Sequence, residues 1–427
     1  MSLTQGTGRM TQQRSAAREF GLPVGMAALA TVPAMYLRFS GGSAGPVGNS
    51  LLFGVAILAA GFLLSWGAEA AERYIATGLV LALVALVTVL PEYAVDFYYA
   101  YRAGADPTSG YAAYAAANMT GANRLLIGLA WPLMVLLHWW RNKQRGIALQ
   151  SQNRVEIGFL ALASVYAFVI VVKNSISLLD FAILAAIFGA YLFRTVKMPE
   201  ADGEEEAEEP GPAAIIALLS PAWRWTVMGA LTVVAAGVIL LAAEPFAESL
   251  VKAGTRLGID EFLLIQWLAP LASEAPAITI AILFVFDDRA RAALTTMVSD
   301  KINQWTLLVG MLPVAMSIGA GTLTALPLDA RQHEEFFLTA TQSLFGLALL
   351  MQLRLSVVSA VSLSGLFVVQ VAAAFYFQDN AETQIAVLTG IGWMYLALAV
   401  LLIARNYREI PAIVRATFGL KPPAGQA

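Results

Sequence analysis

Apolar runs of about 20 residues dominate this sequence, and short polar segments separate them. A run of that length can cross a bilayer core of about 30 Å as an α-helix. The pattern predicts an all-α polytopic membrane protein with about twelve transmembrane helices. The expected ranges are 22–38, 51–72, 76–101, 112–139, 155–172, 177–195, 225–250, 261–286, 292–318, 338–353, 356–377 and 385–404.

Lysine and arginine are unevenly distributed over the loops that these helices define. With the N-terminus inside, 18 of the 26 lie on the inner side, 6 lie on the outer side, and Arg124 and Lys301 lie within helices. Positive residues favour the cytoplasmic side of a membrane. The sequence therefore predicts cytoplasmic N- and C-termini, in a plasma membrane of the bacterial inner-membrane type.

The first apolar run could also belong to a signal peptide, because three arginines precede it. No small-residue cleavage site stands next to its end at Leu37-Arg38. We therefore expect a retained helix.

Charged residues are few, and the acidic ones are clustered. Of the 427 residues, 59% are hydrophobic and 13% are charged, whereas soluble domains carry about 25% charged residues. Residues 200–209 hold seven acidic groups, within a segment at 198–212 that has no apolar run. We interpret this segment as a flexible cytoplasmic linker rather than a calcium sensor. The chain has no cysteine, which excludes disulfides and thiolate sites.

The two halves of the chain repeat each other at polar positions inside apolar runs. NMTGANRLLIG, which begins at Asn118, matches DKINQWTLLVG, which begins at Asp300. The same offset of 182 residues places Glu92 on Glu274. Each half therefore carries a carboxylate followed 26 residues later by an Asn or Asp. Paired carboxylates in a duplicated membrane domain are typical of a cation transporter.

The repeat is expected to be inverted. Matched helices lie five apart along the chain, and an odd offset makes partners cross the membrane in opposite directions. AAGFLL at 59–64 matches AAGVIL at 235–240 as a further pair. The sequence thus predicts a core of two inverted five-helix repeats, in which a substrate site lies near the midplane. The expected divisions are an N-terminal tail with an extra helix at 1–50, the first repeat at 51–197, the acidic linker region at 198–224, the second repeat at 225–377 and a C-terminal helix with tail at 378–427.

Prolines stand beside both glutamates. Pro91 precedes Glu92, and a proline removes one backbone hydrogen bond and frees a carbonyl on the preceding turn. Asp96 lies one turn after Glu92 on the same face. Glu274 lies between the two prolines of LAPLASEAPA, so we expect that helix to be broken as well. Carbonyls freed in this way must face protein, water or an ion.

These oxygen-bearing groups suit a hard cation. Calcium takes six to eight oxygens from carboxylates, amides, carbonyls and water. The candidate ligands are Glu92, Asn118, Glu274, Asp300 and Asp96. The candidates for a coupling or structural role are Lys301, Arg124, Thr88, Ser273 and Asn123. This set holds no histidine or cysteine, which disfavours zinc and copper. The alternative is that the acids form structural ion pairs with Arg124 and Lys301, but the same costly group in both halves favours function.

These residues resemble the sodium/calcium exchanger family of the cation/calcium antiporter superfamily. That family has a Pro-Glu on one helix and a G-N-x-x-G-S-N-type motif on the next. Here LPE ends at Glu92, and ANMTGAN at 117–123 has Ala122 for the family serine. The resemblance covers roughly 51–377 and suggests a divergent bacterial-type member. It implies exchange of calcium for sodium by alternating access. It implies central ligands at Glu92, Asn118, Glu274 and Asp300.

The second repeat departs from the family pattern. Spacing to Asp300 places Glu274 on the family glutamate, whereas alignment by proline places Ala277 there. The family's Thr-Ser pair keeps only Thr88 as a hydroxyl, and Lys301 adds a fixed positive charge beside the proposed site. The coupling ion and the position that matches the family glutamate therefore stay open.

We expect a secondary antiporter that exchanges calcium, or a similar cation, for sodium. Proton coupling through Asp96 or Glu274 is the rival within this class, and a non-transporting structural membrane protein is the alternative outside it. An enzyme is not expected, because the polar residues converge on a midplane and the chain has no H-E-x-x-H motif and no cysteine nucleophile. The expected partners are the lipid bilayer and the transported ions, with no cofactor and no nucleic acid. Nothing in the sequence gives the oligomeric state.

Overall fold

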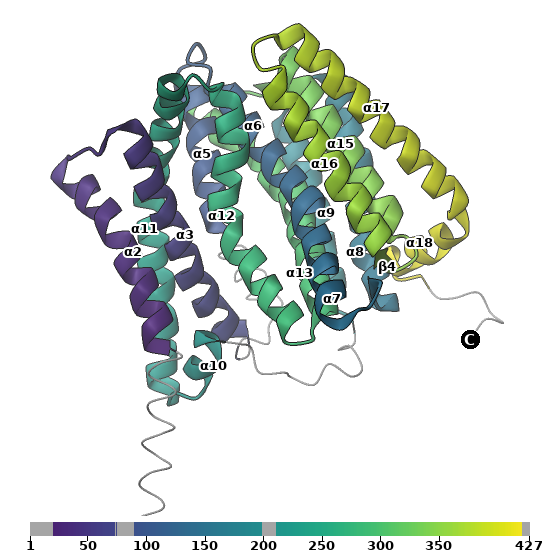
Figure 1. Ribbon diagram of the computed structural model, residues 1–427, viewed down its shortest axis with the longest axis horizontal. Helices are drawn as coiled ribbons and strands as arrows, with labels where there is room; N and C mark the ends of the chain where they lie inside the picture. Colours follow the sequence, from purple (N-terminus) through teal and green to yellow (C-terminus); the bar gives the residue numbers. More distant parts are fainter. Residues whose placement is uncertain (1–19, 73, 75–88, 199–210, 421–427) are drawn as a thin grey trace, which may run out of the picture. The chain divides into compact units, whose positions relative to one another are not determined.

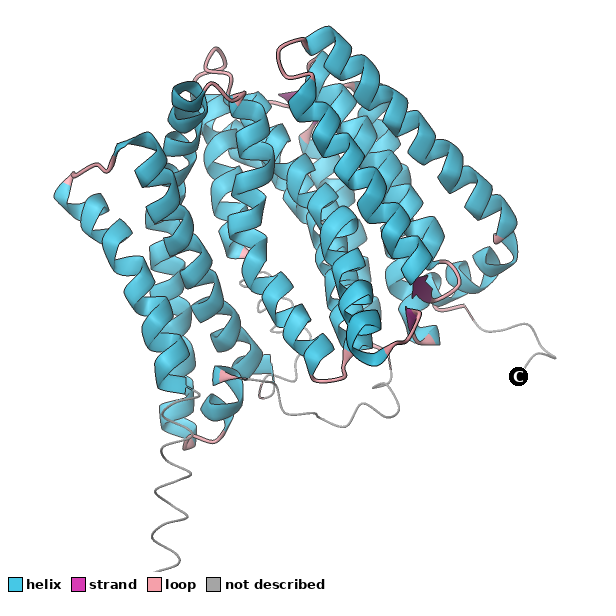
Figure 2. Cartoon of the chain, viewed as in Figure 1, coloured by secondary structure: helices cyan, strands magenta, loops and turns pink. Residues whose placement is uncertain are grey.

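The computed structural model describes residues 20–72, 74, 89–198 and 211–420, which are mostly long α-helices joined by short loops (Figures 1 and 2). The helices of the first half are α2 (Leu22–Ser40), α3 (Gly45–Glu72), α5 (Leu90–Ala105), α6 (Tyr111–Leu125), α7 (Trp131–Asn142), α8 (Arg154–Lys173) and α9 (Leu178–Val196). Those of the second half are α10 (Pro212–Ala217), α11 (Pro221–Leu257), α12 (Glu261–Phe286), α13 (Ala290–Asn303), α14 (Val309–Ala320), α15 (Ala330–Leu350), α16 (Val357–Tyr376), α17 (Ala381–Arg405) and α18 (Ile410–Phe418). The shorter elements are the strands β1 (Gly146–Ala148), β2 (Ser175–Ile176), β3 (Leu326–Pro327) and β4 (Arg354–Ser356), the π-helical turns η2 (Leu126–Ala130) and η4 (Gln304–Leu308), and the 3-10 turns η3 (Ser151–Asn153) and η5 (Tyr407–Glu409).

Ten helical segments among the described residues are long and apolar enough to cross a membrane. In two of them a π-helical turn joins two α-helices: η2 joins α6 to α7, and η4 joins α13 to α14. Two expected helices are not among the ten. Of the range 76–101, residues 76–88 lie outside the described part. The range 338–353 falls on α15, which begins at Ala330 and carries three charged residues in its first two turns.

The start of α15 corrects the expectation that this helix begins at residue 338. Its N-terminus is fixed by Asp329, whose carboxylate accepts a hydrogen bond from the backbone N–H of Gln332 at 2.8 Å in a capping box. Glu334 and Glu335, which made this segment resemble a loop in the sequence, are buried in the helix. The charge pattern was therefore misread because Arg124, the ion-pair partner of Glu335, lies far away in the sequence.

The chain divides into two compact units. The first consists of 1–95, 202–253 and 272–276, and the second of 96–201, 254–271 and 277–427. Helices α5, α11 and α12 each contribute residues to both units.

In the first unit, α3 packs against α2 and against α11 (Figure 1). A Cβ added to Gly54 would lie 3.0 Å from the ring of Phe246, and one added to Gly67 would lie 3.2 Å from Oγ1 of Thr232. Glycines let membrane helices approach closely in this way. Because later positions of α3 meet earlier positions of α11, the two helices run antiparallel. They are the first helices of the two repeats, so this is the direction that an inverted repeat requires.

In the second unit, the short strands pair in a reciprocal way. Strand β1, which follows α7, pairs antiparallel with β4, which lies between α15 and α16, with Ile147 opposite Leu355. Strand β3, which follows α14, pairs antiparallel with β2, which lies between α8 and α9, with Ile176 opposite Leu326. Each repeat therefore contributes two equivalent strands, and each of them pairs with a strand of the other repeat. Exchange of equivalent elements is what a two-fold relation between the repeats produces.

Helix packing in the second unit also relates equivalent helices of the two repeats. Helix α7 packs against α16, and its counterpart α14 packs against α9. The counterparts α8 and α15 pack against each other. Helices α5 and α14 meet at Gly104 and Gly319, where an added Cβ would lie 1.9 and 2.0 Å from a backbone oxygen of the other helix. The contact with α14 thus fixes the part of α5 that follows the candidate residue Asp96.

Candidate cation-binding site

The two matched glutamates are both buried in the first unit. Glu92 lies in the first turn of α5, directly after Pro91, and Glu274 lies within α12. Each is 3% exposed. A charged side chain at the centre of a bilayer costs about 2.5–3.5 kcal/mol or more, so such groups are kept where they pair or bind. Both glutamates are therefore buried, and their role as ligands stays a prediction.

The expected break in the second glutamate's helix is wrong, because α12 runs unbroken from Glu261 to Phe286. Pro270 has no N–H to donate to the carbonyl of Gln266, four residues earlier. That carbonyl lies against Gly121 of α6, where an added Cβ would come within 1.8 Å of it. The absence of a side chain at Gly121 thus lets α6 cover the carbonyl, and the helix continues past its proline.

The prolines beside the two glutamates meet at one point of α3. A Cβ added to Gly61 would lie 2.7 Å from Cγ of Pro276 and 3.7 Å from Cγ of Pro91. Pro276 is two residues after Glu274, and Pro91 is one residue before Glu92. The first unit therefore brings together the two turns that carry the matched carboxylates, although 182 residues separate them in the sequence.

In the second unit, Asp96 and Asn118 form a buried pair. Nδ2 of Asn118 donates a hydrogen bond to Oδ1 of Asp96 at 2.8 Å, and the two residues are 1% and 0% exposed. Among the described residues, Oδ2 of Asp96, Oδ1 of Asn118 and Oδ2 of Asp300 are buried atoms with no hydrogen-bond donor. Buried polar atoms nearly always have a partner. Carboxylate and amide oxygens left in this state are suited to a hard cation.

Lys301 is a fully buried amine at the end of α13. Its Nζ donates to Oδ1 of Asn123 at 2.6 Å and to the backbone oxygen of Asn123 at 3.4 Å, and it lies 4.2 Å from the centre of the Trp305 ring. Within the described ranges, no carboxylate lies within ion-pair distance of this amine. The side-chain oxygen of Asn123 is therefore used by Lys301, and the structure does not support Asn123 as an ion ligand.

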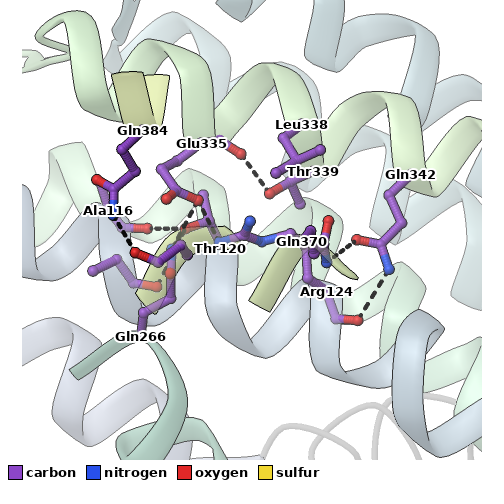
Figure 3. Close-up of polar contacts among 12 residues, drawn as sticks. Ala116, Thr120, Arg124, Gln266, Glu335, Leu338, Thr339, Gln342, Gln370 and Gln384 are labelled. Atoms are coloured by element: carbon purple, nitrogen blue, oxygen red, sulfur yellow. Dashed lines mark hydrogen bonds and ion pairs between the residues drawn. The ribbon is translucent and has the colours of Figure 1, made fainter. Parts of the chain in front are cut away.

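Arg124 forms an ion pair with Glu335 of α15, and both side chains are 1% exposed (Figure 3). Nε2 of Gln266 also donates to Glu335, at 2.8 Å. The guanidinium lies 5.1 Å from the centre of the Trp267 ring, and Nε2 of Gln342 donates to the backbone oxygen of Arg124 at 3.3 Å. Arg124 is thus paired with an acid outside the candidate ligand set, as expected for a structural residue.

The remaining candidates contribute less. Ser273 is 7% exposed and directly precedes Glu274, and Thr88 lies outside the described residues. In the described part of the chain, no group of three or more His, Cys, Asp or Glu side chains is placed to hold a metal ion. The site residues therefore stay candidates, defined by burial and by the unpaired oxygens of Asp96, Asn118 and Asp300.

Sequence comparison decides the family. The family model described as sodium/calcium exchanger protein matches residues 46–197 and 228–376. This chain belongs to the sodium/calcium exchanger family. It is a multi-pass membrane protein and a cation antiporter, in a family of transporters rather than enzymes.

Several solved structures share this fold. The structure titled "Crystal Structure of H+/Ca2+ Exchanger CAX" is 37% identical, covers 95% of this chain and 99% of its own, and has a TM-score of 0.87. Native YfkE is 14% identical, covering 82% of this chain and 98% of its own, with a TM-score of 0.59. The sodium-calcium exchanger NCX_Mj is 19% identical, covering 77% and 98%, with a TM-score of 0.50. The last two share the fold alone. No curated protein sequence matches this chain.

The expected fold class is confirmed: this exchanger is an all-α polytopic membrane protein with a core of inverted repeats. In its second repeat, Glu274 is the buried carboxylate, whereas Ala277 is half-buried and offers no side-chain oxygen. Whichever of the two positions matches the family glutamate, Glu274 supplies the carboxylate in this turn of α12.

Sequence reasoning missed the acids of α15 and the glutamine of α12 that surround Arg124 in this exchanger. One signal could have found them. An arginine inside an apolar helix needs a buried partner, because an unpaired buried charge is strongly destabilising. Glu334 and Glu335 were the acids next to the predicted start of an apolar helix, and extending that helix by two turns would have placed them at membrane depth.

Proposed function

We propose that this protein exchanges calcium for protons across its membrane by alternating access. The observation that carries the proposal is the 37% identity, over 95% of this chain, to a protein described as an H+/Ca2+ exchanger. Sodium, the coupling ion that the family pattern suggests, is the alternative. The Thr-Ser pair of the family pattern is incomplete in this chain. Lys301 also adds a fixed positive charge next to Asp300, which reduces the need for a bound monovalent cation.

We infer that Glu92 and Glu274 of the first unit bind the calcium ion, and that Asn118 and Asp300 of the second unit are also cation ligands, with Asp96 orienting Asn118. Burial supports the role of the two glutamates, because an ionised carboxylate in an apolar span needs a compensating charge. The hydrogen bond from Asn118 to Asp96 uses the amide nitrogen of Asn118. The amide oxygen is thereby left for the ion, which is the atom that calcium requires.

Carboxylate chemistry links calcium release to proton uptake. Two ionised glutamates balance the two charges of one calcium ion. When each takes up a proton, both become neutral, and a neutral acid no longer offsets the cost of dehydrating a divalent cation. The pair Glu92 and Glu274 can therefore hold either one calcium ion or two protons with no change in net charge.

Purified protein in liposomes tests the proposal. Calcium-45 uptake is measured under an imposed proton gradient and, separately, under an imposed sodium gradient of equal ionic strength. The proposal expects uptake with the proton gradient, abolished by a protonophore, and no uptake with the sodium gradient. Uptake with sodium alone would assign sodium coupling, and no uptake under either gradient would contradict calcium exchange. Protein-free liposomes give the background.

A further inference from the structure

Glu334 is a carboxylate buried in the second unit without a hydrogen bond. It lies in the second turn of α15 and is 2% exposed. Neither of its carboxylate oxygens has a hydrogen-bond partner among the described residues. Buried polar atoms in this state require a physical explanation.

The two cations near Glu334 are already paired with other acids. Arg124 of α6 forms its ion pair with Glu335 (Figure 3). Nη1 of Arg331, on the same helix as Glu334, donates to Asp260 at 2.8 Å, near the more exposed end of α15. The charges of Arg124 and Arg331 are thus balanced by those of Glu335 and Asp260. An ionised Glu334 would therefore add one excess negative charge.

Few other titratable groups act on Glu334. The charges that do so are Glu335 and Arg331 on α15 and Arg124 on α6. Helices α8 and α17 also pack against α15. Within its span α17 adds Tyr395, whose ring contacts Phe345, more than two turns beyond Glu334. Helix α8 carries Arg154, Glu156 and Lys173 at its ends and Tyr166 within its span.

An ionised carboxylate in this position would be costly. Burial of a charge without a counter-ion or donors costs several kcal/mol, and such a group is normally neutralised by protonation. We propose that Glu334 is a proton-binding site, separate from the calcium site, in which the carboxyl group is neutral in the folded protein.

This site affects how the pH dependence of transport is interpreted. Arg124 follows Asn123, which accepts the hydrogen bond of Lys301, and Lys301 follows the candidate ligand Asp300. A change of charge at Glu334 therefore acts electrostatically on Arg124, which adjoins Asn123. A change of exchange rate with pH could arise at Glu334, so it does not by itself identify the proton as the exchanged ion.

Infrared spectroscopy of purified protein tests the proposal independently of transport. At neutral pH, the protonated-carboxyl C=O absorbance band of wild type should be weaker in Glu334→Gln, by the contribution of one group. The control Glu382→Gln, at an exposed position in the first turn of α17, should keep the band. Persistence of the full band in Glu334→Gln would overturn the proposal.

Thermal unfolding across pH gives a second measurement. Glutamine resembles a neutral acid, so Glu334→Gln should unfold at the same temperature as wild type in acid. It should unfold at a higher temperature than wild type in alkali, because rising pH ionises Glu334 only in wild type. If Glu334→Gln and Glu334→Met both fail to fold at neutral pH, the negative charge is needed and the proposal is wrong. A sodium-dependent stabilisation that Glu334→Gln abolishes would instead assign a sodium site.

Discussion

When protonated, Lys301 places a positive charge in the same turn as a candidate calcium ligand. The amine is fully buried, and its hydrogen bonds go to Asn123 rather than to an acid. A neutral amide stabilises an ammonium less than a carboxylate does, so most of the field of Lys301 is not cancelled locally. At an effective dielectric constant of about 20, two unit charges 4 Å apart interact by about 4 kcal/mol. A charge of this kind must weaken the binding of a divalent ion nearby.

Removal of this charge should tighten calcium binding. We expect Lys301→Ala to lower the calcium dissociation constant by about tenfold or more, because the repulsion described above is lost. Calcium titration of purified wild type and variant measures the change. The same liposome assay should show whether exchange in the variant has become dependent on sodium.

Two further variants make the Lys301 experiment decisive. Lys301→Met keeps a long unbranched side chain without the charge, and serves if the alanine variant does not fold. Lys252→Ala is the control, since its side chain is 65% exposed and pairs only one turn away with Glu248. Unchanged calcium affinity in a less stable Lys301 variant would assign Lys301 a structural role.

The candidate polar residues stand out in the sequence, but the partners that the structure gives some of them do not. Glu92 and Glu274 stood out because the same costly group recurs at the same offset. Arg124 and Lys301 stood out because charges are rare in apolar runs. Which acid pairs with Arg124 depends on the way α6 faces α15, and no local pattern in either segment encodes that contact.

At the scale of elements, Gly61 is the position where the two proline turns meet α3. Its lack of a side chain is needed because Pro276 would lie 2.7 Å from an added Cβ. A proline ring cannot rotate away, so the turn that carries Glu274 would have to move. The matched position in the second repeat, Gly237, has nothing within 4 Å of an added Cβ.

These two glycines form a matched pair for mutation. Gly61→Ala should lower the exchange rate at least tenfold and the stability by about 1–3 kcal/mol, as overpacking usually does. Gly237→Ala, which is at an equivalent position of its helix, should change neither by a measurable amount. Initial rates of calcium uptake and thermal unfolding test both. Equal effects of the two substitutions would show that the contact with Pro276 does not position the site.

The elements themselves were predicted unevenly. Apolar runs located the helices because length and hydropathy alone satisfy a bilayer. The continuity of α12 was not predictable, since it depends on Gly121 of another helix covering the carbonyl of Gln266. The reciprocal strands were missed because segments of two or three residues have no detectable period. The boundaries proposed for the tails, repeats and linker stay predictions.

For the whole molecule, the repeats set the sides on which loops lie. Pairing of β1 with β4 places the loops after α7 and α15 together, and pairing of β2 with β3 places the loops after α8 and α14 together. The distribution of lysine and arginine predicts that the first group is cytoplasmic and the second external. A plasma-membrane location with both termini inside stays a prediction.

Cysteine labelling tests this orientation in a chain that has no cysteine of its own. Gln144 and Thr322 are exposed positions in the first and second group of loops. In intact cells, a membrane-impermeant thiol reagent should label Thr322→Cys, and should label Gln144→Cys only after permeabilisation. Labelling of Gln144→Cys alone in intact cells would show the opposite orientation. Labelling of both variants in intact cells would contradict the inverted arrangement.

The central claim is that one carboxylate from each repeat binds the transported cation. Calcium-45 uptake into liposomes, driven by the gradient that drives wild type, tests it most directly in Glu92→Gln and Glu274→Gln. Glutamine keeps the size and hydrogen bonding of each side chain but removes the charge that offsets calcium dehydration. The account predicts that each variant folds and that its uptake falls to the level of protein-free liposomes, while Glu382→Gln transports as wild type does. Normal uptake by both variants would contradict it.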